Sequence, residues 1–395
     1  MIPRLCPPIA LHALPRALLP GEPVERFEQA FATLARTRHA IAFPYGRTAL
    51  LCLMEALELR AREIICPSYT CVVVPHAITY SGNAPVFVDC APGSYLMDMA
   101  LAQSAANANT GALIATSFFG EPVSLDALET FSRAHPHVAI IQDCAHSFFC
   151  EDAGRPVHKH GVAAIYGLNV SKLITSVFGG MVTTDDDALA ARLRAVRAAR
   201  IAPARLGKSI QRRLYLIASR LALSRAGYGA VRQLATWGIL DRFVRYYDET
   251  TIDMPADYLQ GLSRFEAAIG TWQCRRYAEV IAHRQALAAQ YHAGLKDCAH
   301  LTLPVPKAGH TWSHYTLRSA AVAHYLKEAA NAGIELGEML EYFIPAMPAY
   351  QSARHIDRGI ARGYIGQTLN LPLHRFVQPA DAARIIALLR TEPSR

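Results

Sequence analysis

The chain has 395 residues, of which 52% are hydrophobic, and it carries a formal net charge of +8 at pH 7. This length suits one large domain with a smaller one, and because no uncharged apolar run reaches about 18 residues, the sequence argues against a membrane span. The nine cysteines are scattered and form no CxxC pair, which indicates neither a zinc site nor a disulfide framework.

Composition also bears on location and partners. We expect reduced thiols in a cytoplasm, and the first residues, "MIPRLCPPIALHALPRALLPGEP", carry prolines and arginines through their apolar part, unlike a signal peptide. A basic chain favours anionic partners such as phosphates. No nucleic-acid-binding motif accompanies the charge, so we expect no nucleic-acid partner, and no metal site is predicted.

Residues 24 to about 60 have a helical pattern. "VERFEQAFATLA" places its apolar residues three and four apart, and "FPYGRTALLCLMEALEL" follows as a glycine turn that opens a second helix. The next stretch, "EIICPSYTCVVVPHAITYSGNAPVFVDC", predicts a strand, a Pro-Ser turn, an apolar helix, a Gly-Asn turn and another strand.

Further strands alternate with helices up to about residue 186. "GALIATSFFG", "VAIIQDCAHS", "VAAIYGLNVSK" and "GGMVTTDD" read as strands, and "SLDALETFSRAH" as a helix with Ser124 at its N-cap. Strands separated by helices predict an α/β fold with a mostly parallel, doubly wound sheet. Ligands of such sheets lie beyond the carboxyl ends of the strands, where Asp143, His146 and Lys172 fall.

The sequence becomes strongly basic between Leu189 and Tyr247. Thirteen arginines and lysines from Arg192 to Arg245 face one acid, Asp241, which predicts two or three basic amphipathic helices, with an insertion at about 200–247. Such a stretch usually packs with a solvated charged face; the alternative is adsorption to an anionic membrane.

The remaining chain predicts a long helix and a small domain. "GLSRFEAAIGTWQCRRYAEVIAHRQALAAQYHAGL" reads as one helix, and the segments after about Leu301 mix short strands and helices. We therefore divide the chain into a large domain at 1–250, which includes the basic insertion, and a part at 251–395 that holds the long helix and a small α/β domain.

Three segments offer parts of one kind of site. "YGRTAL" places Gly46, Arg47 and Thr48 at a helix start, where backbone N–H groups bind phosphate, although such a start often serves only as a cap. Lys172 stands alone among residues that look buried, so it either snorkels outward or has a lowered pKa. Asp143, at a strand end, could be a turn residue. An aspartate and a lysine on neighbouring strand ends are also what pyridoxal phosphate (PLP) needs, because the lysine bonds to the cofactor and the aspartate keeps its ring nitrogen protonated.

The sequence resembles the DegT/DnrJ/StrS-type PLP-dependent sugar aminotransferases, which have fold type I. The resemblance runs from about Phe27 to Leu388, apart from the basic insertion. It rests on the motifs "GRTAL", "CPSYTCVVVPHAITYSGNAPVFVD", "TSFFGEPVSLDAL", "IQDCAHSF", "NVSKLITSVFGGMVTTDD", "LSRFEAAIGTWQCRRYAEVIAHR" and "LNLPLH". It implies that Lys172 bonds to the cofactor, that Asp143 pairs with its ring nitrogen and that His146 lies beside it.

The resemblance also implies the phosphate-binding turn, which falls on Gly46, Arg47 and Thr48. Three positions depart from the family pattern. Cys71 stands where a stacking aromatic ring is usual, and Tyr69 is a possible substitute. Gly167 stands where a serine commonly contacts phosphate, with Ser171 nearby, and Leu259 matches an asparagine that reaches in from the partner subunit.

The implied reaction is amino transfer from glutamate to a nucleotide-linked keto sugar, in a homodimer with shared active sites. Lys172, once released, is the natural proton shuttle, and its presence disfavours the dehydratase branch of the family, which has histidine there. Two alternatives stay open: another PLP reaction such as elimination or decarboxylation, and a binding or regulatory protein on the same fold. His310, His314 and Tyr315 are expected to be structural, with a place on the substrate side as the alternative.

Overall fold

A computed structural model of the chain describes residues 1–7, 21, 23–224, 227 and 250–392. The predicted basic stretch at 200–247 therefore lies partly outside the described residues. Its described part includes α7 (Leu206–Ala222), the helix that follows α6 (Asp187–Arg200).

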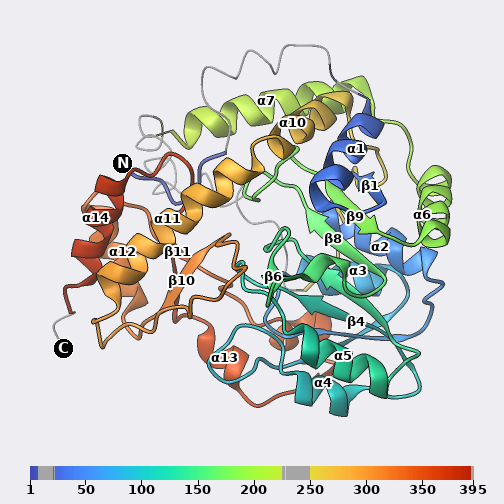
Figure 1. Cartoon of the computed structure of the whole chain (residues 1–395), viewed down its shortest axis with the longest axis horizontal. Coiled ribbons are helices and arrows are strands. Elements are labelled where there is room, and N and C mark those ends of the chain that lie inside the picture. Colours follow the sequence, from blue (N-terminus) through green and yellow to red (C-terminus); the bar gives the residue numbers. More distant parts are fainter. Residues whose placement is uncertain (8–20, 22, 225–226, 228–249, 393–395) are drawn as a thin grey trace.

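An eight-stranded sheet forms the centre of the molecule (Figure 1). Across the sheet its strands are β1 (His39–Phe43), β9 (Gly180–Thr184), β8 (Ala163–Gly167), β5 (Ala139–Asp143), β4 (Thr110–Thr116), β2 (Glu63–Pro67), β3 (Ala84–Val88) and β12 (Arg354–Ile356). β9 is antiparallel to both of its neighbours, whereas the pairs from β8 to β12 are parallel. The predicted mostly parallel, doubly wound sheet is confirmed.

Helices cover both faces of this sheet because successive strand residues point to opposite sides. Ile41 and Ile141 face one layer, while Ala40 and Ile140 face the other. The first layer contains α2 (Gly46–Ala56), α3 (Val73–Tyr80) and α6. The second contains α1 (Val24–Ala35), α10 (Arg264–Cys274), α4 (Met99–Ala105) and α5 (Leu125–Ala134). Ser124 caps α5 as predicted, since its hydroxyl accepts from the Ala127 N–H at 3.3 Å.

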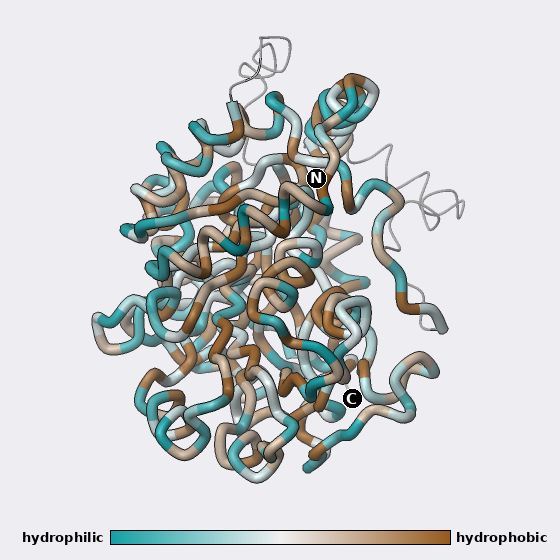
Figure 2. Tube along the Cα trace, turned by 90° about the vertical axis from the view of Figure 1, so that its right-hand side faces the viewer, coloured by the Kyte–Doolittle hydropathy of each residue, from teal (hydrophilic) through white to brown (hydrophobic). Residues whose placement is uncertain are grey.

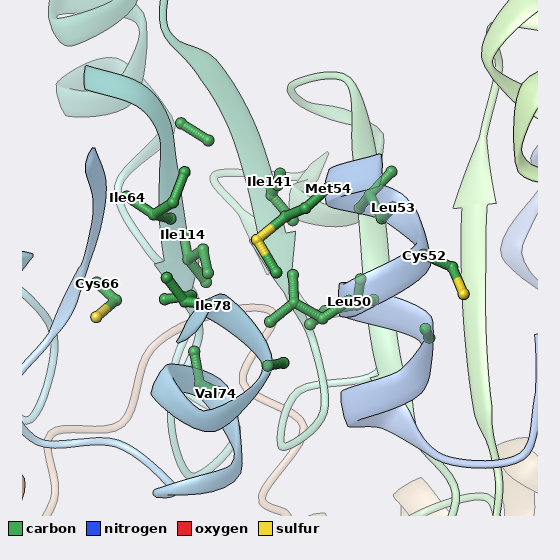
Figure 3. Close-up of a cluster of buried hydrophobic side chains, with 14 of the residues drawn as sticks. Leu50, Cys52, Leu53, Met54, Ile64, Cys66, Val74, Ile78, Ile114 and Ile141 are labelled. Atoms are coloured by element: carbon green, nitrogen blue, oxygen red, sulfur yellow. The ribbon is translucent and has the colours of Figure 1, made fainter. Parts of the chain in front are cut away.

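The side of the sheet that carries α2 has a dry aliphatic core. Figure 3 shows Leu50, Leu53 and Met54 of α2 directed toward the strands, with Ile114 and Ile141 among their neighbours. All five side chains are at most 1% exposed. This packing holds α2 on the large sheet over β8, β9 and β1, and so places the first turn of α2 near the carboxyl end of β8.

A second, smaller layer follows α10. The three-stranded sheet consists of β10 (Tyr315–Arg318), β13 (Thr368–Leu371) and β11 (Gly337–Glu338), in that order. Its helices are α11 (Tyr277–Leu295), α12 (Val322–Asn331) and α14 (Pro379–Leu389). The shorter elements are β6 (Glu151–Asp152), β7 (Arg155–Pro156), η2 (Val157–Lys159), η3 (Ile344–Ala346), η4 (Pro348–Tyr350) and α13 (Ile360–Tyr364).

Two elements differ from the sequence prediction. The helical pattern predicted for 24–60 contains β1, whose short apolar run "HAIAF" pairs with β9. The single helix predicted after Leu262 is two helices, because Arg276 leaves helical geometry with φ −110° and ψ 3°. This break lets α10 pack against α1 while α11 packs against α14.

The chain crosses between the two layers more than once. β12, near the C-terminal end, pairs with β3 of the large sheet, and Ile2, at the other end, packs in the core of the small layer and pairs with Ile334. The domain boundary predicted near residue 250 stays a prediction.

Hydrophobic residues gather inside the trace and hydrophilic residues in its outer turns (Figure 2). Among the described residues, every helix is too short or too polar to traverse a bilayer.

Gly270 lies where α10 packs against Phe27 of α1. A Cβ atom there would overlap the ring of Phe27 on α1. We expect Gly270→Ala to lower the free energy of unfolding by about 1–3 kcal/mol, because overpacking outweighs the better helix propensity of alanine. Urea unfolding followed by circular dichroism measures this.

The matched control is Gly207→Ala in the first turn of α7, where a Cβ would meet open space. This change should raise the free energy of unfolding by up to about 1 kcal/mol. Equal stability of Gly270→Ala and the wild type would show that α1 and α10 can separate without loss.

Candidate active site

Asp143 and Lys172 come from neighbouring strands of the large sheet. Asp143 is the last residue of β5, and it lies opposite Ile165 of the parallel strand β8. Lys172 lies in the loop that joins β8 to β9, where its N–H donates to the Asn169 carbonyl at 3.1 Å. The two side chains interact electrostatically, so the strand-end site predicted from the sequence brings them together.

The Asp143 carboxylate is buried with few donors around it. It is 4% exposed and accepts from the Ala145 N–H at 3.0 Å and from the Thr116 hydroxyl at 3.4 Å. Burial raises the pKa of Asp143, opposed by the Ala145 N–H, by Lys172 and by Thr116. A carboxylate with so few donors can accept a further hydrogen bond from a cationic N–H group.

Lys172 is half-buried beside this carboxylate. Burial lowers the pKa of Lys172 below its usual value, and the neighbouring Cys71 and Asp143 offset this only in part. A lysine with a lowered pKa is neutral more of the time, which a nucleophilic amine requires.

The first turn of α2 stands next to the ends of β8 and β9. A Cβ on Gly46 would lie 3.2 Å from the Gly167 Cα, and a Cβ on Gly180 would lie 2.6 Å from the Gly46 nitrogen. The close approach at Gly180 leaves no room for a side chain. The N–H groups of Arg47 and Thr48 belong to the first turn of α2, whose N–H groups have no partner within the helix.

The hydroxyls near this turn are already engaged. Thr48 is fully buried and donates its hydroxyl hydrogen to the Tyr258 carbonyl at 3.1 Å. Ser171 donates its own to the Asn169 side chain at 2.5 Å. Backbone N–H groups, rather than these hydroxyls, are therefore the donors that the turn can offer to a phosphate.

Three stacked rings stand beside Lys172. His146 stacks on Phe118 with ring centres 4.7 Å apart, and on His314 with centres 4.9 Å apart. Burial, together with the charge of Lys172, holds the pKa of both histidines well below the usual range, so both rings are neutral at pH 7. The buried Nδ1 of His146 has no hydrogen-bond partner in the described residues.

His314 reaches this stack from the small layer. Its N–H donates to the Phe119 carbonyl at 3.2 Å, and the Thr311 N–H donates to the Gly120 carbonyl at 3.0 Å. Gly120 has a φ of +104°, and a Cβ there would meet the Trp312 nitrogen at 2.5 Å, so this contact needs glycine. From the sequence, a place for His314 on the substrate side of the site was the alternative to a structural role. In the structure, its ring stacks on His146.

The other predicted residues have different surroundings. Tyr69 is 1% exposed, stacks on Tyr95 and donates its hydroxyl to the Met339 carbonyl at 3.4 Å. The Tyr69 ring is thus already stacked on another aromatic ring. Cys71, the other candidate for this position, interacts electrostatically with Lys172. His310 stacks on Trp312 at 3.8 Å.

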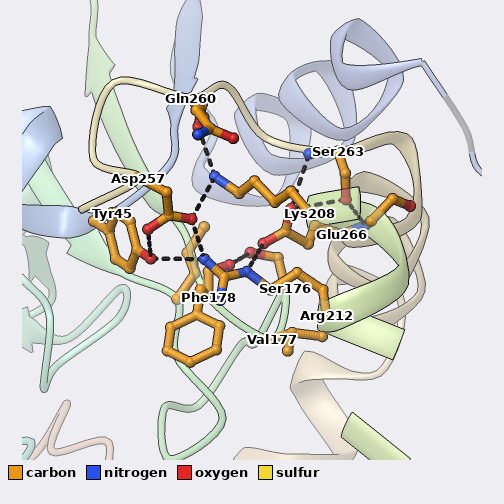
Figure 4. Close-up of polar contacts among 12 residues, drawn as sticks. Tyr45, Ser176, Val177, Phe178, Lys208, Arg212, Asp257, Gln260, Ser263 and Glu266 are labelled. Carbon is orange, nitrogen blue, oxygen red and sulfur yellow. Dashed lines mark hydrogen bonds and ion pairs between the residues drawn. The ribbon is translucent and has the colours of Figure 1, made fainter. Parts of the chain in front are cut away.

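A buried ionic network that the sequence did not reveal supports the first turn of α2 (Figure 4). Arg212 of α7 donates to the Tyr45 hydroxyl and to Asp257, both at 2.6 Å. Tyr45 precedes Gly46 and donates to the other oxygen of Asp257 at 2.5 Å. Lys208 lies 3.3 Å from Asp257, and Glu266 lies 3.4 Å from Arg212.

A model of the DegT/DnrJ/EryC1/StrS aminotransferase family matches residues 15–390. The chain belongs to this family. GDP-perosamine synthase of Caulobacter vibrioides is 27% identical over 378 residues, which cover 93% of this chain and 90% of that protein.

Solved structures of this family share the fold. DesI, determined with its TDP-sugar product, has a TM-score of 0.76 at 21% identity and covers 99% of this chain and 93% of its own. The PLP form of Spr1654 from Streptococcus pneumoniae has a TM-score of 0.75 at 17% identity, and the match covers 98% of this chain and 97% of that one. The predicted family, fold type I and aminotransferase activity are confirmed.

The residues present fit the cofactor of DegT/DnrJ/EryC1/StrS enzymes. Asp143 can accept a ring N–H, Lys172 lies beside it, and the close-packed glycines leave backbone N–H groups at the first turn of α2. A Cβ on Gly167 would meet Ala145 and Lys172 at an ordinary 3.6 Å. There is therefore room at this position for the Cβ of the serine that the family usually has. Within the described residues, His, Cys, Asp and Glu form no group of three or more that could hold a metal.

The neutral state of His314 predicts a pH effect on stability. The unfolded chain binds a proton at this residue as the pH falls through about 6.5, but the folded chain does not, so the free energy of unfolding falls below that pH. His314→Phe keeps a ring in the stack and should make the decline between pH 6.5 and 5 shallower by at most about 1.4 kcal/mol per pH unit.

Thermal and urea unfolding across this pH range provide the measurement. His137→Phe, at an exposed histidine, is the control and should leave the slope unchanged. An unchanged slope in His314→Phe would mean that this ring takes up a proton in the folded protein as readily as in the unfolded chain.

Proposed function

We propose that the chain binds PLP at this site and transfers an amino group from glutamate to the keto group of a nucleotide-linked sugar. The observation that carries the proposal is the pairing of the buried Asp143 carboxylate with Lys172 beside the first turn of α2. The perosamine synthase and the DesI structure with a TDP-sugar support a sugar substrate, and the net charge of +8 suits a diphosphate.

Each residue has one task in this proposal. When bound, PLP supplies an electron sink that stabilises negative charge at the substrate carbon. Asp143 accepts a hydrogen bond from the ring N–H, and its own burial keeps water from competing. Lys172 would hold the cofactor through its Nζ, and the same amine would move a proton to and from the substrate carbon.

The remaining residues bind and orient. Backbone N–H groups of Arg47 and Thr48 hold the phosphate, because the Thr48 hydroxyl hydrogen is committed to Tyr258. Arg47 is half-buried at the same turn and adds positive charge. His146, neutral and fixed between two rings, presents a ring nitrogen for hydrogen bonding beside the cofactor.

The assembly and setting belong to the same proposal. We expect a homodimer with shared active sites in a cytoplasm, as the family resemblance implies. Leu259 offers no polar side chain to a partner site, so the partner contribution of this chain comes from other residues. For the stretch 200–247, ordinary packing is the first expectation and peripheral contact with an anionic membrane is the alternative.

The decisive experiment loads the purified protein with PLP and adds glutamate. We expect the visible cofactor band to bleach and to recover when a nucleotide keto sugar from a panel is added, with an aminated product in mass spectrometry. A lyase would release product from the donor without bleaching the band, and a binding protein would do neither.

Borohydride trapping with peptide mass spectrometry identifies the lysine. The label should fall on Lys172 and vanish, along with turnover, in Lys172→Ala. Lys159→Ala, which removes a partly exposed lysine paired with Asp185, is the control and should change neither. A label on Lys208, a buried lysine of α7, would overturn the assignment.

Asp143→Asn tests the ring-nitrogen partner. Because an unprotonated pyridine is a poor electron sink, turnover should fall by orders of magnitude while part of the cofactor stays bound, as absorbance and equilibrium dialysis would show. Asp98→Asn, at the buried N-cap of α4, should lower stability but leave turnover near that of the wild type. Near-normal turnover of Asp143→Asn would make Asp143 a turn residue.

A further inference from the structure

Three of the four basic residues of α7 point into the protein. Lys208, Arg212 and Arg220 are 5–6% exposed, and they lie four or eight residues apart on one side of the helix. Lys208 donates to the Gln260 carbonyl at 2.6 Å, and the Arg220 guanidinium lies 4.6 Å from the ring centre of Phe376. Three of the cations on which the predicted membrane attraction depended are therefore used for internal contacts.

The opposite side of α7 is aliphatic and exposed. Its outward residues are Leu206 (77% exposed), Ile210 (48%), Leu214 (62%) and Leu221 (52%), spaced by four and seven positions. Five of the seven large hydrophobic side chains that are exposed among the described residues lie on this helix. We name Leu206, Ile210, Leu214 and Leu221 the α7 ridge.

We infer that the α7 ridge docks on an anionic lipid surface. The helix has 17 residues and so is about 25 Å long. It runs along the periphery of the molecule, outside α10 (Figure 1). An amphipathic helix at the periphery of a protein, with an exposed aliphatic side, can insert at the boundary between headgroups and acyl chains.

Charge selects an anionic surface over a neutral one. α7 contains no acid, and its N-cap Arg205 is exposed. The neighbouring α10 begins with the exposed Arg264 and is followed by the exposed Arg275. Each basic residue near such a surface adds attraction that falls off within a Debye length.

Charge also disfavours a second copy of the chain as the occupant. Among the described residues, no comparable aliphatic ridge exists outside α7, so a symmetric contact centred on the ridge would place α7 of one copy against α7 of the other. This pairing would bring the exposed arginines of both copies together without acids on α7 to offset them.

The test is flotation of the full-length protein with vesicles of phosphatidylcholine alone and of phosphatidylcholine mixed with phosphatidylglycerol. We expect binding to the mixed vesicles that weakens with added salt. The triple variant Leu206→Gln, Ile210→Gln, Leu214→Gln should lose at least about tenfold in vesicle partitioning, because the apolar contact supplies much of the affinity. These side chains are exposed, so the variant should fold, which circular dichroism would verify.

Val305→Gln and Tyr80→Gln, at exposed hydrophobic residues outside α7, are the matched controls and should float like the wild type. Absence of wild-type binding to mixed vesicles, or equal binding of the triple variant, would overturn the inference. So would light scattering that shows a smaller particle for the triple variant without any vesicle binding, since the ridge would then join two copies. None of these outcomes depends on transaminase activity, so the proposed reaction stands or falls separately.

Discussion

The structure depends on burying one carboxylate next to one amine at the edge of a parallel sheet. β4, β5 and β8 run in the same direction, so their carboxyl ends meet at one edge, where Asp143 and the loop of Lys172 lie. Burial pushes both groups toward their neutral forms, and neither has enough partners to hold its charge without cost. A cationic ring nitrogen would pair with the carboxylate, and a carbonyl group would react with the neutral amine. Both requirements are met by PLP, which is why this pair of residues suits its chemistry.

The described part of the basic insertion, α7, stabilises this edge of the sheet from outside. Arg212 and Lys208 of α7 share Asp257, and Arg212 and Asp257 hold the Tyr45 hydroxyl directly before the first turn of α2. Ion pairs this well buried add little net stability, yet losing one partner leaves the others unpaired. The network therefore acts mainly to fix geometry: α7 cannot move away from α10 without freeing Tyr45. The side of α7 that faces outward and the side that supports the site belong to one rigid element.

The sequence was sufficient to place site residues at the ends of strands. It was insufficient for the elements and side-chain orientations that depend on tertiary contacts. Asp143 and Lys172 could be placed because apolar runs ending in polar residues mark the strands. β1 was missed because a five-residue apolar run between two helices has no period long enough to distinguish it from helix. β12, with its half-buried Arg354 and His355, carries no alternation and becomes a strand only by pairing with β3. The orientation of the basic residues of α7 was also predicted wrongly. An amphipathic pattern predicts that charged side chains face solvent, whereas Arg212 faces inward because Asp257 and Glu266 lie there.

The small layer is coupled to the site through another buried cation. Arg284 of α11 is 8% exposed and donates to the carbonyls of Trp312 and Ser313, at 3.2 and 2.7 Å. Burial lowers the pKa of Arg284 to about 10, with Tyr277 offsetting this only in part, so the guanidinium still carries its charge at pH 7. Burial, and after it the charges of Lys172 and Arg284, lower the pKa of His314, while the two carbonyl contacts fix the backbone that carries this ring. The segment before β10 is thus held from α11 on one side and from Phe119 and Gly120 on the other. Any shift of the small layer must therefore move a ring that stacks on His146, which makes the geometry around Lys172 a property of both layers.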